Sequence, residues 1–563
     1  MSQSLFDASQ PQPTAPRQDH FLQGYLIRGL FFLGEMIILI GLSLYILAGA
    51  KLVPFHGDES TILYTTRDVS YILNNQIEHV LYSATPEKIG PSAAAEQELR
   101  LLNGTVARYV YGFFAMNQRT RQPFEPINEQ WDWGASFGYN LETGHMPATL
   151  QLNRARLISS FFLIGAMLSL YGLTRLIGGR GTALIAALYF TLNPAVLING
   201  RRAMMESSWL FFGLLAMWMA AWLCVRIQGV RRPSEPRFPQ PLFNVISVRD
   251  VTRLVPNLPV ASNKGQRWWP VPLVIYLRLG GTLGLALASK HTALFYVVAT
   301  LGAVTLGPLW AKRRIWLKHI FGVPLMIAAM IGVFLLLNPA WWGDPIGRLN
   351  EVLRLRSVLL TGQMATFDGY ADTSERLTGL IQQAFVVPPQ YYEVTNWKDV
   401  IADQIVAYEQ SGWQGVSIGG SMAGAGVVII LVLIGLGVCV RALFKRERIV
   451  VQATAPSAQN ENAVYRAIPF EQDGISVQPD ADISPEAVLE TIWPSPMGAW
   501  VALWLGLGGA AAAIVTPLEW QRYYLPLYPA IAVFLGVGVM ALIKALANRR
   551  IEDTAQRDAM SSL

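Results

Sequence analysis

The hydrophobic residues of this chain are gathered in long, almost unbroken runs that are separated by polar stretches. A helix needs about 20 residues to cross the roughly 30 Å hydrocarbon core of a bilayer, and most runs approach that length. Because every backbone polar group must be paired inside lipid, such runs are expected to be helices. We predict about ten spans: Arg28–Ala50, Leu157–Ile177, Thr182–Ile198, Ser207–Val225, Val271–Ala288, Thr292–Trp310, Ile320–Leu337, Ala423–Val440, Trp500–Val515 and Tyr524–Ala545.

The composition agrees with this pattern. Hydrophobic residues make up 52% of the 563 residues and charged residues only 15%, whereas a soluble domain carries about a quarter charged residues. The apolar runs do not alternate with polar positions, so a transmembrane β-barrel is excluded. The predicted fold class is an all-α integral membrane protein, a bundle of about ten transmembrane helices with outer juxtamembrane helices.

Positively charged residues assign a side to each loop. With the N-terminus in the cytoplasm, the short basic loops all fall inside, as the positive-inside rule requires, and both termini are cytoplasmic. These basic segments are Arg180, 226–267, Lys312-Arg313-Arg314, 441–448 and 544–550. The net charge of +6 follows from this bias and does not indicate nucleic-acid binding.

The same alternation divides the chain into parts. We predict a cytoplasmic tail (1–27), a transmembrane core (28–441), a cytoplasmic flexible linker (442–495), and a C-terminal transmembrane pair with a basic tail (496–563). A further Pro- and Arg-rich stretch, 229–265, is also expected to be flexible. Two outer segments, 51–151 and 340–421, are too long for simple connectors and are expected to be folded.

Two adjacent acids, Asp58 and Glu59, follow the first predicted span directly. An ionised Asp at this place could accept a proton from an incoming hydroxyl, or help to hold a divalent cation. The alternative is structural: Asp58 or Ser60 caps the following helix, and Glu59 lies in its first turn. Spacing alone leaves both interpretations open.

Four short motifs accompany the acidic pair, in a fixed order along the chain. They are Arg154-Ala-Arg156-Leu-Ile-Ser, Leu176-Ile-Gly-Gly-Arg180, Gly284-Leu-Ala-Leu-Ala-Ser-Lys290 and Gln521-Arg522-Tyr523-Tyr524-Leu525-Pro526-Leu527-Tyr528-Pro529. Together with Asp58-Glu59 they resemble the GT-C glycosyltransferases, within them the protein O-mannosyltransferases and lipid A aminoarabinose transferases. The resemblance covers most of the chain and implies that Asp58 is the catalytic residue. The Pro-Pro-Leu element of that family is absent here, which leaves the type of acceptor open.

Basic residues at the outer ends of spans run against the charge bias and therefore call for a reason. We interpret them as a binding site for the phosphate of a lipid-linked sugar donor, because Arg forks to phosphate oxygens and Lys supplies a point charge. The alternative is that they pair with acids or extend to lipid headgroups. The candidates are Arg156, Arg201, Arg202, Lys290, His291, Arg522 and Tyr523.

The combined prediction is a glycosyltransferase of the cell (inner) membrane whose active site faces outward. It would move a sugar from a polyprenyl-phosphate carrier to a glycan, lipid or protein acceptor, with Asp58 as the base and Glu59 orienting it or binding the acceptor or a metal. Membrane lipids are its other partners. No cluster of His, Cys and acidic residues has metal-ligand spacing, so no cofactor is assigned, and a divalent cation stays open. The alternatives are a transporter or lipid flippase, and a non-catalytic membrane subunit.

Overall fold

A computed structural model describes residues 18–83, 93–117, 119–227, 273–310, 316–394, 396–416, 421–444, 448–453, 465–470 and 494–561. The chain forms two compact units, Met1–Leu44 and Tyr45–Leu563. The described part of the first unit belongs to helix α1 (Gln18–Ala48), whose last residues enter the second unit. Most of the predicted tail, the 229–265 stretch and much of the 442–495 linker lie outside the described residues.

Six described helices are long and apolar enough to cross a membrane. Three shorter apolar helices cover 273–289, 291–307 and 321–337, which is where three further spans were predicted. The six candidate spans are Gly29–Ala48, Thr149–Leu192, Glu206–Val225, Met422–Phe444, Pro496–Val515 and Tyr528–Arg549. The prediction of a multi-pass α-helical membrane protein is therefore confirmed, although fewer helices than predicted reach full length.

One candidate span contains two of the predicted ones. Helix α7 (Thr149–Leu192) is broken at Gly179, whose φ of 82° is a left-handed conformation that glycine adopts without steric cost. The predicted span Thr182–Ile198 is wrong at its far end, because α7 stops at Leu192. The Asn193 side chain accepts a hydrogen bond from the Val196 amide there and starts a separate helix, α8 (Pro194–Arg201).

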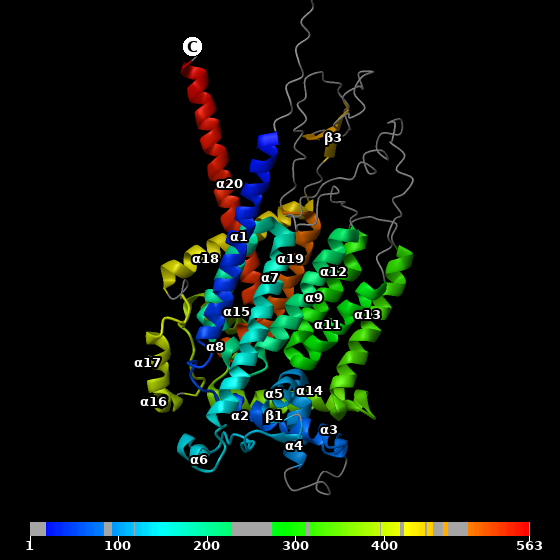
Figure 1. Cartoon of the computed structure of the whole chain (residues 1–563), viewed down its shortest axis with the longest axis vertical. Coiled ribbons are helices and arrows are strands. Elements are labelled where there is room, and N and C mark those ends of the chain that lie inside the picture. The colour runs from blue at the N-terminus through cyan, green and yellow to red at the C-terminus, as the bar shows by residue number, and fades with distance from the viewer. Residues whose placement is uncertain are drawn as a thin grey trace, which may run out of the picture. The chain divides into compact units, whose positions relative to one another are not determined.

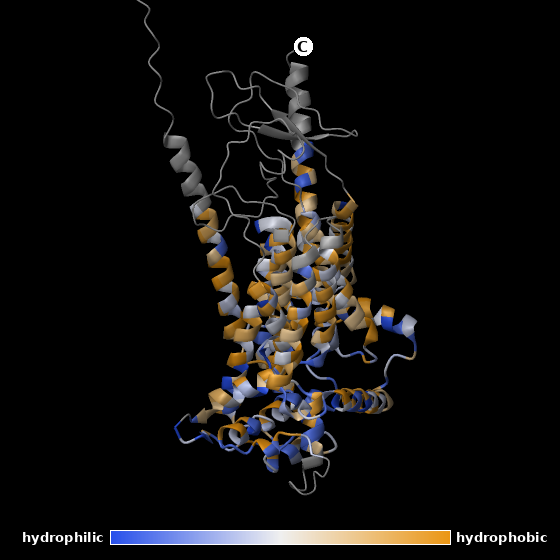
Figure 2. Cartoon of the chain, turned by 90° about the vertical axis from the view of Figure 1, so that its right-hand side faces the viewer, coloured by the Kyte–Doolittle hydropathy of each residue, from blue (hydrophilic) through white to orange (hydrophobic). Residues whose placement is uncertain are grey.

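The apolar helices of the second unit pack side by side as a bundle (Figure 1). Helix α7 packs against α9 (Glu206–Ile227) and α20 (Tyr528–Ser561). Helix α11 (Leu273–Ser289) packs against α13 (Trp316–Leu337) and α9. Helix α12 (Leu294–Trp310) contacts α19 (Pro496–Val515), and α18 (Met422–Phe444) contacts α20. Figure 2 shows apolar residues along these helices and mixed polarity at the end of the bundle.

The two long segments that were predicted to face outward gather at the same end of the bundle, opposite the end of α20 (Figure 1). The first segment forms α2 (Gly57–Tyr64), α3 (Arg67–Leu73), η1 (Ile77–His79), α4 (Ala93–Leu102), α5 (Thr105–Ala115) and α6 (Phe137–Glu142). Strands β1 (Met116–Asn117) and β2 (Gln122–Pro123) form a short antiparallel pair within it. The second segment forms η4 (Pro339–Trp341), α14 (Pro345–Phe367), α15 (Thr373–Ile381), the π-helical turn η5 (Gln382–Val386), α16 (Trp397–Val400) and α17 (Ala402–Gln410).

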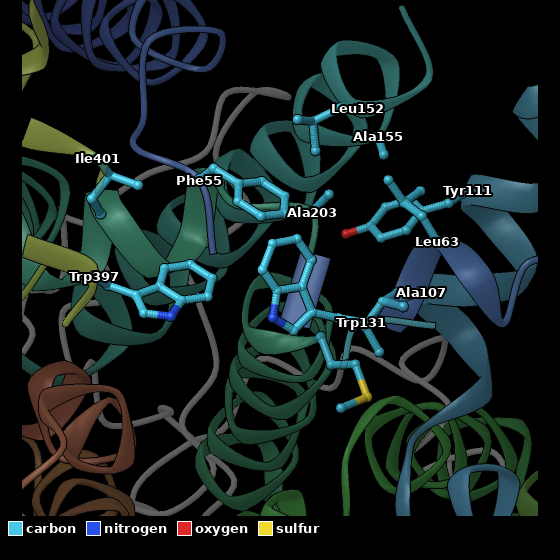
Figure 3. Close-up of a cluster of buried hydrophobic side chains, with 12 residues drawn as sticks. Phe55, Leu63, Ala107, Tyr111, Trp131, Leu152, Ala155, Ala203, Trp397 and Ile401 are labelled. Carbon is cyan, nitrogen blue, oxygen red and sulfur yellow. The ribbon is translucent and has the colours of Figure 1, made fainter. Parts of the chain in front are cut away.

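A shared apolar core joins the two segments into one folded layer. Phe55 and Trp131 of the first segment pack against Trp397 and Ile401 of the second, and all four side chains are buried (Figure 3). The Phe55 and Trp397 rings are stacked with their centroids 6.2 Å apart. Burying each aromatic side chain contributes about 1.5–3 kcal/mol. The two segments are therefore folded together, as their length predicted, and which side of the membrane they occupy stays a prediction.

Two short turns and a pair of strands complete the described chain. Two 3₁₀ turns, η3 (His291–Ala293) and η6 (Gln521–Tyr524), lie where α11 meets α12 and where α19 leads into α20. Strands β3 (Arg448–Ala453) and β4 (Tyr465–Phe470) pair antiparallel, with Arg448 opposite Phe470. This pair falls within the predicted 442–495 linker, so part of that stretch has regular structure.

Candidate active site

The acidic pair stands on the first turn of α2, but the helix is capped by the residue before it. The His56 ring nitrogen Nδ1 accepts a hydrogen bond from the Asp58 amide at 3.1 Å, and the His56 amide donates to Glu59 Oε2 at 3.1 Å. This reciprocal arrangement satisfies two of the amides that a helix start leaves unpaired. The structural alternative, in which Asp58 or Ser60 caps the helix, is therefore wrong, and the Asp58 carboxylate is available for other contacts.

The Asp58 carboxylate forms an ion pair with the Arg522 guanidinium of η6. Arg522 Nε also donates to Glu393 Oε1 at 2.8 Å, and Glu393 Oε2 lies 3.5 Å from His56 Nε2. The Asp58 side chain remains 32% exposed, whereas Glu393 and Arg522 are almost buried. Asp58 is thus the accessible member of a four-residue charge network.

Burial alone would raise the pKa of Asp58, but the Arg522 cation, followed by His56 and Lys290, outweighs it and lowers that pKa to about 2. Asp58 is consequently ionised at neutral pH. An ionised carboxylate that is still partly exposed can accept a proton or hydrogen bond from a bound molecule.

Glu59, in contrast to Asp58, is buried and paired within the protein. Its side chain is 0% exposed, and it accepts two hydrogen bonds from Arg156 of α7, at 2.8 and 2.7 Å. The Ala203 amide donates a further bond at 2.8 Å. Burial raises the pKa of Glu59, but Arg156 outweighs it and the pKa falls below the ordinary value. Glu59 therefore anchors α2 to the bundle, and neither partner of this pair has a free face for a substrate.

Arg201 and Arg202, at the end of α8, are buried and satisfied by the protein itself. Arg201 donates to the Ile46 carbonyl at 2.9 Å, the Tyr45 carbonyl at 2.6 Å and the Tyr408 hydroxyl at 2.6 Å. Arg202 donates to the Pro54 carbonyl at 3.1 Å and the Tyr391 carbonyl at 2.5 Å. These bonds tie α8 to both outer segments. A role in packing accounts for all of these contacts.

Lys290 and its neighbour His291 lie where α11 ends. Lys290 Nζ pairs with Glu206 Oε1 at 2.6 Å, and its charge acts on Asp58. The His291 ring instead packs edge-on against Trp341, with ring centroids 6.1 Å apart. Lys290 thus joins the charge network around Asp58, whereas His291 contacts an apolar neighbour.

Tyr523 stacks on Trp520, with ring centroids 5.6 Å apart and an interplanar angle of 14°. Burial raises the pKa of its hydroxyl although Arg522 opposes this, so the hydroxyl stays protonated at neutral pH. It is a possible hydrogen-bond donor beside Arg522.

Comparisons with known proteins bear on this arrangement. No known family profile matches the sequence, and no curated protein matches it. One similar solved structure is the protein O-mannosyltransferase Pmt1-Pmt2 complex of S. cerevisiae bound to the sugar donor, with 15% identity over 56% of this chain and 34% of that chain, at a TM-score of 0.31. Another is the oligosaccharyltransferase AglB of Archaeoglobus fulgidus in complex with an inhibitory peptide and a dolichol-phosphate, with 11% identity over 92% of this chain and 52% of that chain, at a TM-score of 0.42.

These structural neighbours are GT-C glycosyltransferases. The chain spans about half of the AglB length and a third of the Pmt1-Pmt2 chain. The overlays are loose at these TM-scores, and the donors and peptides named above are those of the neighbours.

Two residues of the second outer segment belong to the network and were not predicted. Glu393 lies in a loop, where no periodicity marks a contact, so its pairing with Arg522 follows only from the fold. The position of Arg356 on α14 could have been noticed in the sequence. It follows the buried Val352 by four positions and therefore lies on the same face of the helix. Burial, and then the nearby Arg522 cation, lowers the pKa of Arg356. Within the described part of the chain Arg356 forms no ion pair.

The candidate site brings together part of the predicted set. Asp58, Arg522, Lys290 and Tyr523 come together, whereas Arg156, Arg201 and Arg202 make other contacts. Across the described residues, no group of three or more His, Cys, Asp or Glu side chains is arranged to hold a metal ion. The described site contains the partly exposed Asp58 carboxylate together with the paired charges of Arg522, Glu393 and Lys290.

Proposed function

We propose that this chain is a membrane glycosyltransferase that moves a sugar from a polyprenyl-phosphate-type lipid carrier to an acceptor on the extracytoplasmic face of the cell (inner) membrane. The observation that carries the proposal is the ionised, partly exposed Asp58 carboxylate beside the Arg522 guanidinium. Such a transfer needs a base for the acceptor and a cation for the leaving phosphate, close together. Asp58 stands on α2, which belongs to the folded layer at the end of an apolar bundle (Figure 1), and this position supports a donor that is anchored in lipid.

The reaction follows from these groups. Asp58 accepts the proton of an acceptor hydroxyl while that oxygen attacks the anomeric carbon of the donor sugar. The new carbon–oxygen bond forms as the bond from that carbon to the phosphate oxygen breaks, and the bonding electron pair leaves with the phosphate. Attack opposite to the leaving group inverts the configuration at the anomeric carbon.

The cations serve the leaving phosphate in this proposal. Arg522 and Arg356 offer guanidinium groups, which bind phosphate oxygens in pairs, and Lys290 adds a compact positive charge. Positive charge that is held in place before the reaction lowers the barrier, because negative charge grows on the phosphate as the bond breaks. Arg356 is the simplest candidate for this role. Burial and the nearby Arg522 cation disfavour its ionised form, and a bound phosphate would stabilise that form.

Arg522 links the donor to the base. It is shared between Asp58 and Glu393 in the structure, and a phosphate that binds Arg522 competes with both carboxylates. Weakening the Asp58–Arg522 pair raises the pKa of Asp58, because Arg522 is the largest of the influences that lower it. Asp58 thus becomes a stronger base when the donor is present.

The test is transfer by the purified full chain in lipid, with radiolabelled polyprenyl-phosphate sugars and a panel of acceptors. Asp58→Asn is expected to lower turnover by about 10²-fold or more, the usual contribution of a general base. Asp403→Asn, an exposed acid on α17, is the matched control and should transfer like the wild type. Equal turnover in Asp58→Asn removes the base assignment. No transfer by the wild type across the panel removes the glycosyltransferase proposal.

A further inference from the structure

A large aromatic ring stands directly beside the proposed base. A Cβ atom placed on Gly57 would lie 2.8 Å from Trp133 Cζ2 and 2.9 Å from Cη2, so the indole lies against the backbone of the residue before Asp58. The Trp133 ring is also 5.8 Å from the His56 ring, centroid to centroid. Only a glycine at position 57 lets the ring approach α2 this closely. Because His56 Nδ1 is itself 3.9 Å from Asp58 Oδ2, the Trp133 ring lies close to the surroundings of the Asp58 carboxylate.

The ring is held rigidly although it is largely exposed. Trp133 stacks on Trp397, with centroids 5.4 Å apart and planes 19° apart, and Trp397 itself is buried in the apolar core of the layer (Figure 3). The backbone before it is clamped by the buried Asn140, which accepts from the Asp132 amide at 2.8 Å and donates to the Asp132 carbonyl at 2.9 Å. Trp133 nevertheless remains 46% exposed. Trp397 packs against one face of the ring, and close to half of the Trp133 residue stays exposed.

The residues beside Trp133 in the sequence are exposed. Its neighbours Asp132 and Gly134 are both exposed, and the Glu129 side chain nearby in sequence is 64% exposed. Trp133 thus exposes an aromatic surface beside carboxylates and close to the proposed base, and this combination suits a ligand with an apolar face and polar edges.

We propose that Trp133 is the platform for a sugar ring of the acceptor, so that the acceptor is a glycan or glycolipid. This inference rests on the proposed function. A pyranose ring has an apolar C–H face and a rim of hydroxyls. The C–H face can pack on the indole ring, and the hydroxyls can donate hydrogen bonds to the carboxylates beside it. A ring stacked on Trp133 presents its hydroxyls toward α2, where the proposed reaction needs one at Asp58. A preorganised platform also loses little entropy when the sugar binds.

The binding test uses the full chain in lipid nanodiscs and saturation-transfer NMR with neutral trisaccharides of α-mannose, β-glucose and β-galactose. A serine- and threonine-containing peptide is the comparison. We expect at least one trisaccharide to bind through its C–H face. Trp133→Ala should weaken its binding about tenfold, and Trp133→Phe should retain most of it, because the phenyl ring keeps a stacking face. Trp342→Ala is the matched control, since Trp342 is 44% exposed but is not part of this cluster, and it should bind like the wild type.

Transfer kinetics separate the possible failures. Trp133→Ala should raise the KM for the acceptor and leave the KM for the donor unchanged. Trisaccharide binding that is unaffected by Trp133→Ala overturns the platform, as does binding of the peptide in place of every trisaccharide. Trisaccharide binding that requires Trp133 but is never followed by sugar transfer leaves the platform standing and removes the proposed function.

Discussion

The Arg522 guanidinium pairs with the Asp58 carboxylate across 464 positions of the sequence. Arg522 also holds Glu393, so a residue of η6 joins the first and second outer segments at one point. This contact couples the position of the last transmembrane pair to the protonation of the proposed base. The predictions below concern the charges around it and the residues that hold it in place.

The first prediction concerns pH. The pKa of Asp58 is depressed to about 2, so the stability that its ionised form contributes is present above its ordinary pKa of about 3.9 and is lost as pH falls through about 2. Arg522→Gln removes the main cation, and burial then raises that pKa. The acid limb of kcat/KM should therefore move upward in Arg522→Gln, and Arg121→Gln, an exposed control, should leave it unchanged. An acid limb at the same pH in both variants contradicts the pairing.

The second prediction concerns donor binding. Arg356→Gln should raise the KM for the lipid-linked donor about tenfold, because one charged hydrogen bond to phosphate is lost. Arg354→Gln is the matched control on the same helix, since Arg354 is exposed and pairs with Glu351 at 2.7 Å. The measurement is initial-rate kinetics at varied donor concentration. Equal donor KM values for the two variants would remove Arg356 from the site.

The third prediction concerns Glu59, which the sequence suggested as a second catalytic residue. Glu59→Ala leaves Arg156 as an unpaired buried charge, and breaking such a pair costs about 3–5 kcal/mol of folding free energy. A Glu59→Met and Arg156→Met double variant should recover much of that loss. Thermal unfolding in detergent measures both, with the exposed Glu129→Gln as control. A stable Glu59→Ala protein that cannot transfer sugar would return Glu59 to the catalytic machinery.

The fourth prediction separates packing from phosphate binding at Arg201. Arg201→Met leaves the Tyr45 and Ile46 carbonyls without their donor, at a cost of about 1–3 kcal/mol for each buried group. The melting temperature should fall while the donor KM of the folded fraction stays at the wild-type value. Arg154→Met, at an exposed position of α7, is the control. A raised donor KM with an unchanged melting temperature would instead support the phosphate-binding role.

Much of the fold was predictable because lipid restricts the backbone to helices, so apolar runs translate directly into spans. The exceptions are local. The end of α7 depends on the Asn193 cap, and the break within it depends on the φ of Gly179. Both are short-range geometric features that a hydropathy pattern averages away.

The candidate site was predictable only in part. Asp58 stood out as part of the acidic pair that directly follows the first predicted span, and Lys290 and Arg522 stood out because basic residues at a predicted outer membrane edge are unusual. Glu393 lies in an irregular loop, and nothing in its neighbourhood indicates that it approaches Arg522. The burial of Arg156 and Arg201 could not be predicted from the sequence either. An arginine that binds groups of the protein and one that binds a ligand look the same in a sequence. The charge pattern selected residues of which several lie close together in the fold, and only the packing of the two outer segments distinguishes those roles.

The capping of α2 by His56 has a consequence for the order of the two acids. Consecutive residues of a helix point about 100° apart, so once the cap fixes where the helix begins, position 59 faces the bundle and position 58 faces the open side. The pair is therefore not interchangeable. The double variant Asp58→Glu with Glu59→Asp keeps the composition and net charge. It nevertheless places the shorter side chain opposite Arg156 and the longer side chain opposite Arg522. The first turn of the helix thus gives two similar side chains different positions: Glu59 anchors α2 to the bundle, and Asp58, the proposed base, faces away from it.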